Sequence, residues 1–169
     1  MILNSLQWKV LEPFVNETVL ALEKSLGLKA EADSGFQEKI EEFKFKGFAV
    51  VANTSGSVTG RLLMHHYTET AVTIGNKLLQ HQNPNLAHEH GMGDSVSNAL
   101  ADFAQMIMQP AVQNLQNNDM KIDFTHPYFI SDTEKMDSLL EGVSEILTVP
   151  VRIDQIGRFY LNYLIHTQG

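Results

Sequence analysis

The sequence predicts an α+β fold in which an antiparallel sheet carries helices packed on one face. Two observations predict it. Apolar residues recur at helical spacing in three separate segments, whereas between and after them the period changes to the alternation of strands. Short turns rich in glycine and small polar residues join these strands as hairpins. Helices and hairpins segregated in this way are typical of an α+β protein.

The first predicted helix spans residues 13–26. Pro13 suits the first helical turn, where its missing N–H would be unpaired anyway, and Gly27 can cap the carboxyl end. The apolar residues of this segment recur near helical spacing: Phe14, Val15, Val19, Leu22 and Leu26. Residues 28–33 alternate and predict a short strand, whereas the charge-rich residues 37–46 predict no definite element.

A hairpin and a second helix follow. Residues 45–53 and 57–65 are predicted strands, and residues 54–56 supply the turn chemistry that joins them. Residues 68–80 predict a helix with apolar residues at helical spacing.

The third helix is predicted to begin near Asp94 and Ser95, which are good N-cap residues. Pro110 is expected to kink or break it, and a further helical stretch covers residues 111–115. A charge-rich stretch, residues 132–141, predicts a solvated loop or short helix. The carboxyl-terminal third otherwise returns to strands: 121–124, 147–154 and 156–166.

The composition predicts one compact domain, residues 1–169, of the soluble globular class. Twenty acidic and 12 basic side chains give a formal net charge of −8, which disfavours duplex DNA and anionic lipid as partners. The absence of cysteine excludes disulfide scaffolds, thiolate zinc sites and cysteine catalysis. The start does not resemble a signal peptide, and no apolar run approaches the ~20 residues of a membrane span, so we expect a cytoplasmic protein.

The third helix carries the candidate site. Its apolar residues form one narrow stripe: Val96, Leu100, Phe103, Ile107 and Ala111. The opposite face carries Asn98, Asp102, Gln105 and Gln109, one turn apart. A carboxylate can hold a partner's cation, and a carboxamide three residues on can position a water. Spacing alone favours the ordinary alternative, the solvated face of an amphipathic helix.

The whole chain, from about residue 10 to 166, resembles the CheX branch of the CheC/CheX/FliY chemotaxis phosphatases. The features that carry the resemblance are the Pro13-Phe14 helix, the hairpin over residues 47–64, the helix containing residues 101–107, the segment at Pro127 and the closing hairpin. The family signature is Asp or Ser, three residues, Glu, two residues, Asn, and a proline a little over twenty positions on. Asn98, Asp102, Gln105 and Pro127 stand at these positions.

The resemblance implies an enzyme that hydrolyses the aspartyl phosphate of a response-regulator receiver domain. Asp102 would pair with a lysine of the CheY-like partner, and Gln105 would orient the attacking water. Asn98 and Gln109 would contact the partner. No cofactor is expected on this chain, because the divalent cation (Mg) would come with the phosphorylated partner. The resemblance also implies a homodimer, with the carboxyl-terminal hairpin pairing at a sheet edge.

Two hypotheses follow from the departures in side-chain length. Asp is one methylene shorter than Glu and Gln one longer than Asn, and a displacement of about 1 Å can cost ~10²-fold in rate. The chain is therefore either a phosphatase that compensates for the shift or a non-catalytic dimeric adaptor that binds a receiver domain or motor component. A third, weaker hypothesis is a ligand-binding domain that uses the cleft between sheet and helices.

Other motifs in the sequence suggest alternative candidate sites. His88-Glu89-His90 could chelate a metal with His81, but a solvated loop is the favoured interpretation, and no metal site is predicted. His65 and His66 would point to opposite faces of a strand, one packed and one exposed. Residues 55–60 look like a phosphate loop but lack its Gly-Lys-Ser/Thr ending, so a hairpin turn is expected. Met106 and Met108 flank the polar face, where we expect core packing or an adaptable partner contact.

Overall fold

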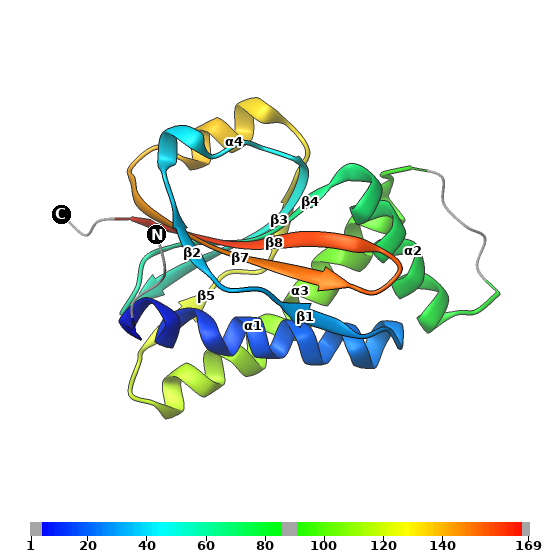
Figure 1. Ribbon diagram of the computed structural model, residues 1–169, viewed down its shortest axis with the longest axis horizontal. Coiled ribbons are helices and arrows are strands. Elements are labelled where there is room, and N and C mark those ends of the chain that lie inside the picture. The colour runs from blue at the N-terminus through cyan, green and yellow to red at the C-terminus, as the bar shows by residue number, and fades with distance from the viewer. Residues whose placement is uncertain (1–4, 86–90, 167–169) are drawn as a thin grey trace.

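The computed structural model describes residues 5–85 and 91–166 (Figure 1). Its helices are α1 (Ser5–Leu26), α2 (Thr68–Gln82), α3 (Asp94–Asn117) and α4 (Thr133–Leu139), with the 3₁₀ turn η1 (Ile40–Glu42). Its strands are β1 (Ala30–Ala32), β2 (Phe36–Glu38), β3 (Gly47–Gly56), β4 (Gly60–Tyr67), β5 (Ile122–Phe124), β6 (Tyr128–Ile130), β7 (Val143–Ile153) and β8 (Gly157–His166).

The eight strands of the described residues form one sheet in which every pairing is antiparallel. The order is β1-β7-β8-β4-β3-β5, with β2 also paired to β7 and β6 also paired to β3. Short strands therefore lie along both edges, β1 and β2 on one and β5 and β6 on the other. The predicted α+β class and antiparallel sheet are confirmed.

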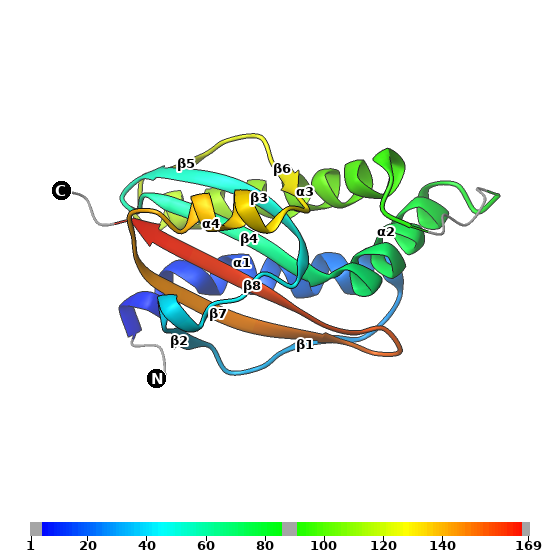
Figure 2. The ribbon, with the colours of Figure 1, turned by 90° about the horizontal axis from the view of Figure 1, so that it is seen from above.

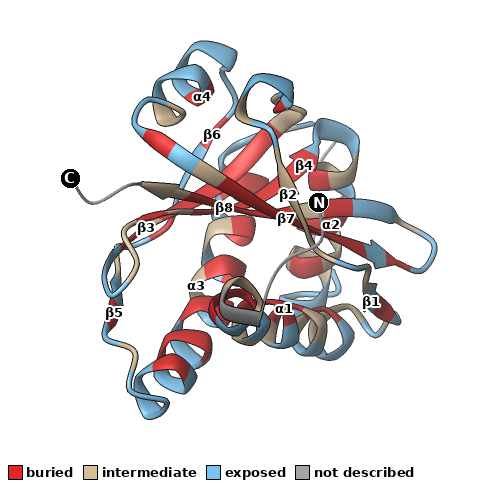
Figure 3. Cartoon of the chain, turned by 60° about the vertical axis from the view of Figure 1, so that its left-hand side comes forward, coloured by how far each residue is buried: buried red, intermediate tan, exposed pale blue. Residues whose placement is uncertain are grey.

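The helices α1, α2 and α3 cover one face of the sheet, and α4 and η1 lie over part of the other (Figures 1 and 2). The larger apolar core fills the space between the sheet and α1–α3, where the buried surfaces of strands and helices face one another (Figure 3). A smaller core lies beneath η1 and α4, around Phe43, Leu63 and Met136. The sequence predicted helices on one face of the sheet only, so the layer that η1 and α4 form on the other face was not predicted.

Two prolines that were expected to mark helix boundaries lie inside helices. Helix α1 begins at Ser5, so Pro13 falls in its interior, and α3 runs unbroken through Pro110. Each proline leaves a carbonyl four residues earlier without its helical donor. Pro110 lies on the exposed side of α3, where water can solvate the carbonyl of Met106, while Ile107 and Ala111 anchor the helix in the core.

Two further sequence predictions need correction. Gly93, not Asp94 or Ser95, is the N-cap of α3, and it makes no side-chain capping bond. The strands β7 and β8 lie inside the sheet, because β8 pairs with β4 and the outer side of β7 pairs with β1 and β2. The carboxyl-terminal hairpin therefore offers no free edge for the expected dimer.

Candidate functional site: the polar face of helix α3

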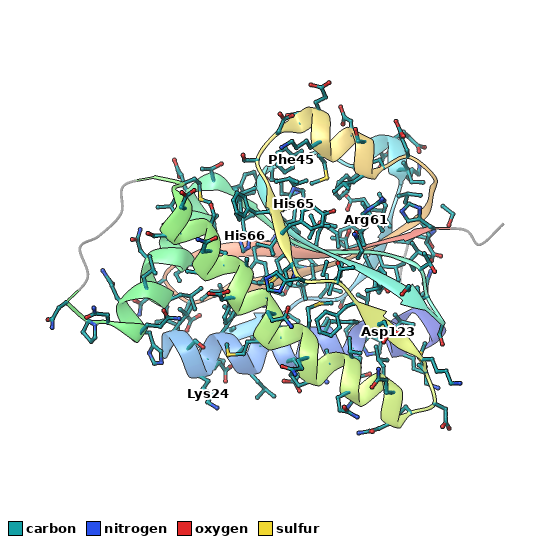
Figure 4. The ribbon with its side chains drawn as sticks, turned by 180° about the vertical axis from the view of Figure 1, so that it is seen from behind. Lys24, Phe45, Arg61, His65, His66 and Asp123 are labelled. Carbon is teal, nitrogen blue, oxygen red and sulfur yellow. The ribbon has the colours of Figure 1, made fainter. Side chains whose placement is uncertain are left out.

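Helix α3 lies between α1 on one side and the β5–β6 segment on the other (Figures 2 and 4). Its predicted apolar stripe is buried in the larger core over its whole length: Val96, Leu100, Phe103, Ile107 and Ala111. Because this stripe faces inward, the opposite face must look away from the core. The helix thus holds its polar residues on a rigid element at the molecular surface.

The four predicted site residues lie together on that outward face, although not equally exposed. Asn98, Asp102 and Gln109 are exposed, whereas Gln105 is half-buried. Among the described residues, no side chain forms an ion pair with Asp102. Its carboxylate is therefore available to a cation supplied from outside the chain.

The carboxamide of Gln105 is only partly presented to solvent. Its Oε1 is buried and has no hydrogen-bond partner among the described residues. A buried carbonyl without a donor costs about 1–3 kcal/mol, so a contact that satisfies it or draws it outward is favoured. On the wheel of α3, Gln105 lies on the side toward β5 and β6, and Pro127 is buried immediately before β6.

Apolar side chains border the polar face. Met106 is 49% exposed, whereas Met108 is buried. Met106 and Pro110 line an open groove of about 670 Å³ between α1 and α3, opposite Leu20 of α1, which is 59% exposed. Sequence reasoning singled out neither Leu20 nor Phe129 of β6, which is 41% exposed, because no local pattern marks them.

A second polar cluster lies on the other face of the sheet, around His65. The Lys46 backbone N–H donates to His65 Nε2 at 2.9 Å, and His65 Nδ1 lies 2.9 Å from Asn162 Oδ1, to which it donates. The Asn162 amide then donates to Thr148 Oγ1 at 2.8 Å, and this hydroxyl donates to Glu38 Oε2 at 2.6 Å. Burial, with a smaller effect of the Lys46 charge, lowers the pKa of His65 to about 4, so the ring is neutral.

His66 has a different environment on the helix-covered face. It is fully buried, and neither ring nitrogen has a hydrogen-bond partner among the described residues. Burial, and then the neighbouring His65, lowers the pKa of His66 to about 3. The expectation that one of the two histidines is exposed is wrong, because α1–α3 cover one face of β4 and residues 39–46 cover the other (Figure 4).

The remaining candidate sites receive less support. His88-Glu89-His90 lies outside the described residues. Within the described residues, no group of three or more histidine, cysteine, aspartate or glutamate side chains could hold a metal ion. The β3–β4 hairpin is present, but its turn is formed by residues 57–59 and not by the predicted residues 54–56, which continue β3 and pair with β5. The segment is thus a hairpin turn and not a phosphate loop. The void between the sheet and α3, lined by Leu62 and Ala104, measures about 10 Å³, which is room for no more than one water. Among the described helices, none has the length and apolar character of a membrane span.

Comparison with known proteins identifies the fold. No family model and no curated protein matches the sequence. The structure, however, superposes on the chemotaxis protein CheX from Desulfovibrio desulfuricans with a TM-score of 0.74 at 15% identity, covering 94% of this chain and 99% of that one. FliY from Thermotoga maritima gives 0.70 at 11% identity, covering 98% and 92%.

A third structure includes a partner. The CheX–CheY–BeF₃–Mg²⁺ complex from Borrelia burgdorferi gives a TM-score of 0.72 at 22% identity, covering 94% of this chain and 98% of that one. The match over nearly full length on both sides confirms the predicted fold, that of the CheX, CheC-like and FliY chemotaxis proteins.

Proposed function

We propose that this chain is a CheX-like protein that hydrolyses the aspartyl phosphate of a response-regulator receiver domain. The observation that carries the proposal is the outward face of α3. Asp102 lies there without an ionic partner in the described part of the chain, and the Gln105 carboxamide lies three residues on. By the resemblance, these residues would stand at the two catalytic positions of the family signature.

The proposed chemistry needs little more than placement. Asp102 accepts a hydrogen bond from the receiver's lysine and fixes the docked partner, while Gln105 holds a water in line with the phosphorus atom. The water attacks phosphorus, and the bond between phosphorus and the receiver's carboxylate oxygen breaks. Inorganic phosphate and the free carboxylate result, and both protons of the water leave with the phosphate as dihydrogen phosphate. The divalent cation arrives with the receiver, and no covalent intermediate forms on this chain.

The complex of the Borrelia burgdorferi protein supports the choice of partner. That protein forms an assembly with CheY, BeF₃ and Mg²⁺. Since the present chain has the same fold over nearly its whole length, a CheY-like receiver domain is the partner class that we propose for it. The acidic character of the chain, with a net charge of −8, suits contact with a lysine-bearing surface.

One observation favours a second candidate function, that of a non-catalytic adaptor. Gln105 Oε1 is buried, so the free protein does not present the carboxamide fully for positioning a water. If docking does not draw the amide outward, the same face would recognise a phosphorylated receiver without hydrolysing its phosphate. Binding through Asp102 would then persist while phosphate release stayed at the receiver's own rate.

An assay with a panel of phosphorylated receiver domains from the same organism distinguishes the phosphatase from the adaptor. Phosphate loss is followed with wild type, Asp102→Ala, Gln105→Ala and the control Asp137→Ala, which removes an exposed carboxylate on α4 at the opposite face. Acceleration with one receiver that either α3 substitution abolishes and the control preserves supports the phosphatase. Phosphorylation-dependent binding without acceleration supports the adaptor, and acceleration unaffected by both substitutions refutes the site.

We also propose that the chain forms a homodimer. Because β7 and β8 are interior, the pairing must use another surface than the carboxyl-terminal hairpin, and the short edge strands β1–β2 and β5–β6 are the available sheet edges. Size-exclusion chromatography with light scattering measures the mass directly. A mass of 18.9 kDa across the concentration range would refute the dimer.

A further inference from the structure

Three exposed large apolar side chains lie on either side of the polar face of α3. They belong to a set of five among the described residues: Leu20, Tyr67, Met106, Tyr128 and Phe129. Met106 lies on α3 itself, Leu20 lies across the groove on α1, and Phe129 lies on β6 at the other side of the helix. Apolar side chains of this size that border a polar stripe on both sides are typical of a binding surface.

Phe129 is held in place by a row of rings behind it. The strands β8, β4, β3 and β6 are neighbours in that order, and each contributes one ring on the helix-covered face. The Phe159 and His66 centroids are 4.8 Å apart, those of His66 and Phe48 are 6.5 Å apart, and those of Phe48 and Phe129 are 5.9 Å apart. The first three rings are buried and only Phe129 emerges.

This row makes Phe129 a preordered contact. An exposed aromatic side chain normally loses rotamer freedom when a partner covers it, and that loss weakens binding. The stacking of Phe129 on the buried Phe48 ring has already fixed its position in the free protein. Rigid aromatic side chains of this kind dominate the binding energy of protein interfaces.

The groove on the other side of α3 adds a charge pattern. Besides Leu20, Met106 and Pro110, its lining includes the carboxylates of Glu17 and Glu23 and one cation, Lys24. Together with Asp102, these residues give the α1–α3 side an acidic border around apolar side chains. Such a border complements a partner that brings a lysine to Asp102.

We propose that Phe129 on one side and the Leu20–Met106 pair on the other are the docking contacts for the receiver domain, which spans α3 between them. The proposal rests on the proposed function, since the receiver is the occupant. It goes beyond that function by assigning binding energy to apolar residues outside the α3 polar face. These contacts exclude water around the carboxylate and carboxamide, which strengthens the polar interactions between them and the partner.

The test measures the affinity for the receiver that responds in the panel, loaded with BeF₃ and Mg²⁺, by titration calorimetry. Phe129→Ala is expected to raise Kd by ~10-fold or more, and Leu20→Ala combined with Met106→Ala by a similar factor. The matched control is Tyr67→Ala, which removes a side chain 52% exposed at the start of α2 and should leave Kd unchanged. All four side chains are at least two-fifths exposed, so thermal unfolding should confirm that each variant folds.

A kinetic measurement tests the same contacts during dephosphorylation. At concentrations below saturation, Phe129→Ala should slow dephosphorylation of the receiver by about the factor by which it raises Kd, whereas Tyr67→Ala, outside the proposed docking contacts, should keep the wild-type rate. If wild type binds the receiver and the Phe129 and Leu20/Met106 variants bind equally well, the docking surface is refuted while the proposed function stands. If wild type binds no receiver of the panel, the proposed function fails and this surface fails with it.

Discussion

Replacement of His66 by phenylalanine is expected to change how the stability of the protein depends on pH. His66 is fully buried, its two ring nitrogens lack partners among the described residues, and burial lowers its pKa to about 3. The folded protein therefore keeps the ring neutral, whereas the unfolded chain binds a proton as the pH falls below about 6.5. Stability is thus fully present above pH 6.5 and is lost progressively toward pH 3.

The magnitude follows from proton linkage. At pH 5, His66 is almost wholly protonated in the unfolded chain and neutral in the folded protein. Proton binding by the unfolded chain therefore lowers the free energy of unfolding by about 2 kcal/mol relative to neutral pH. His65, whose pKa burial lowers to about 4, adds a similar loss of about 2 kcal/mol. His66→Phe should therefore remove about half of the histidine-dependent loss. At neutral pH the variant should be more stable by about 1–3 kcal/mol, because a ring of similar shape replaces an unpartnered polar group.

Urea unfolding at pH 7.5 and pH 5, followed by circular dichroism, measures both effects. The control is Leu20→Ala at an exposed residue of α1 that carries no ionisable group, and it should keep the wild-type difference between the two pH values. A His66→Phe variant that keeps the full pH dependence, or that is less stable at pH 7.5, would show that the imidazole has a bonding partner and would refute the reasoning.

Three further predictions concern packing, the polar network and the site. Asn162→Ala breaks a buried chain of side-chain hydrogen bonds and should lower the unfolding free energy by about 1–3 kcal/mol in urea titrations; an unchanged midpoint would contradict this. A Cβ on Gly75 would lie 2.5 Å from Val96 Cγ1, so Gly75→Ala should lower the free energy of unfolding by about 1–3 kcal/mol. Adding Val96→Ala should relieve this clash, and a double-mutant cycle measures the relief. Asp102→Glu with Gln105→Asn gives the family's side-chain lengths and should accelerate phosphate loss by up to ~10²-fold; a variant no faster than wild type would show that length does not limit the rate.

The sequence predicted the parts of the fold that depend on local periodicity. The buried stripe of α3 is one case, because a 3.6-residue repeat of apolar side chains fixes which face of a helix meets the core. The β3–β4 hairpin is another, although its turn lies three residues later than predicted because β3 continues through residues 54–56. The outward placement of Asp102 followed from the same helical period, so this part of the candidate site was predictable.

Features that depend on the assembled sheet could not be predicted in this way. The exposure of Phe129 arises because β6 pairs with β3 at an edge, and no residue near it signals that pairing. The burial of both His65 and His66 depends on covering layers that come from distant segments. Pro110 was expected to kink or break α3, but the packing of the helix on either side outweighs one lost hydrogen bond at a solvated carbonyl.

The central claim is that Gln105 activates a water against the receiver's phosphoryl group. Single-turnover decay of the phosphorylated receiver, at a saturating concentration of this protein, tests it most directly when wild type and Gln105→Ala are compared. We expect wild type to accelerate the decay and Gln105→Ala to return it to the receiver's own rate, while its Kd for the BeF₃-loaded receiver stays near that of wild type. The claim is contradicted if the receiver loses its phosphate as fast with Gln105→Ala as with wild type. It is also contradicted if wild type binds the receiver without accelerating the loss of phosphate.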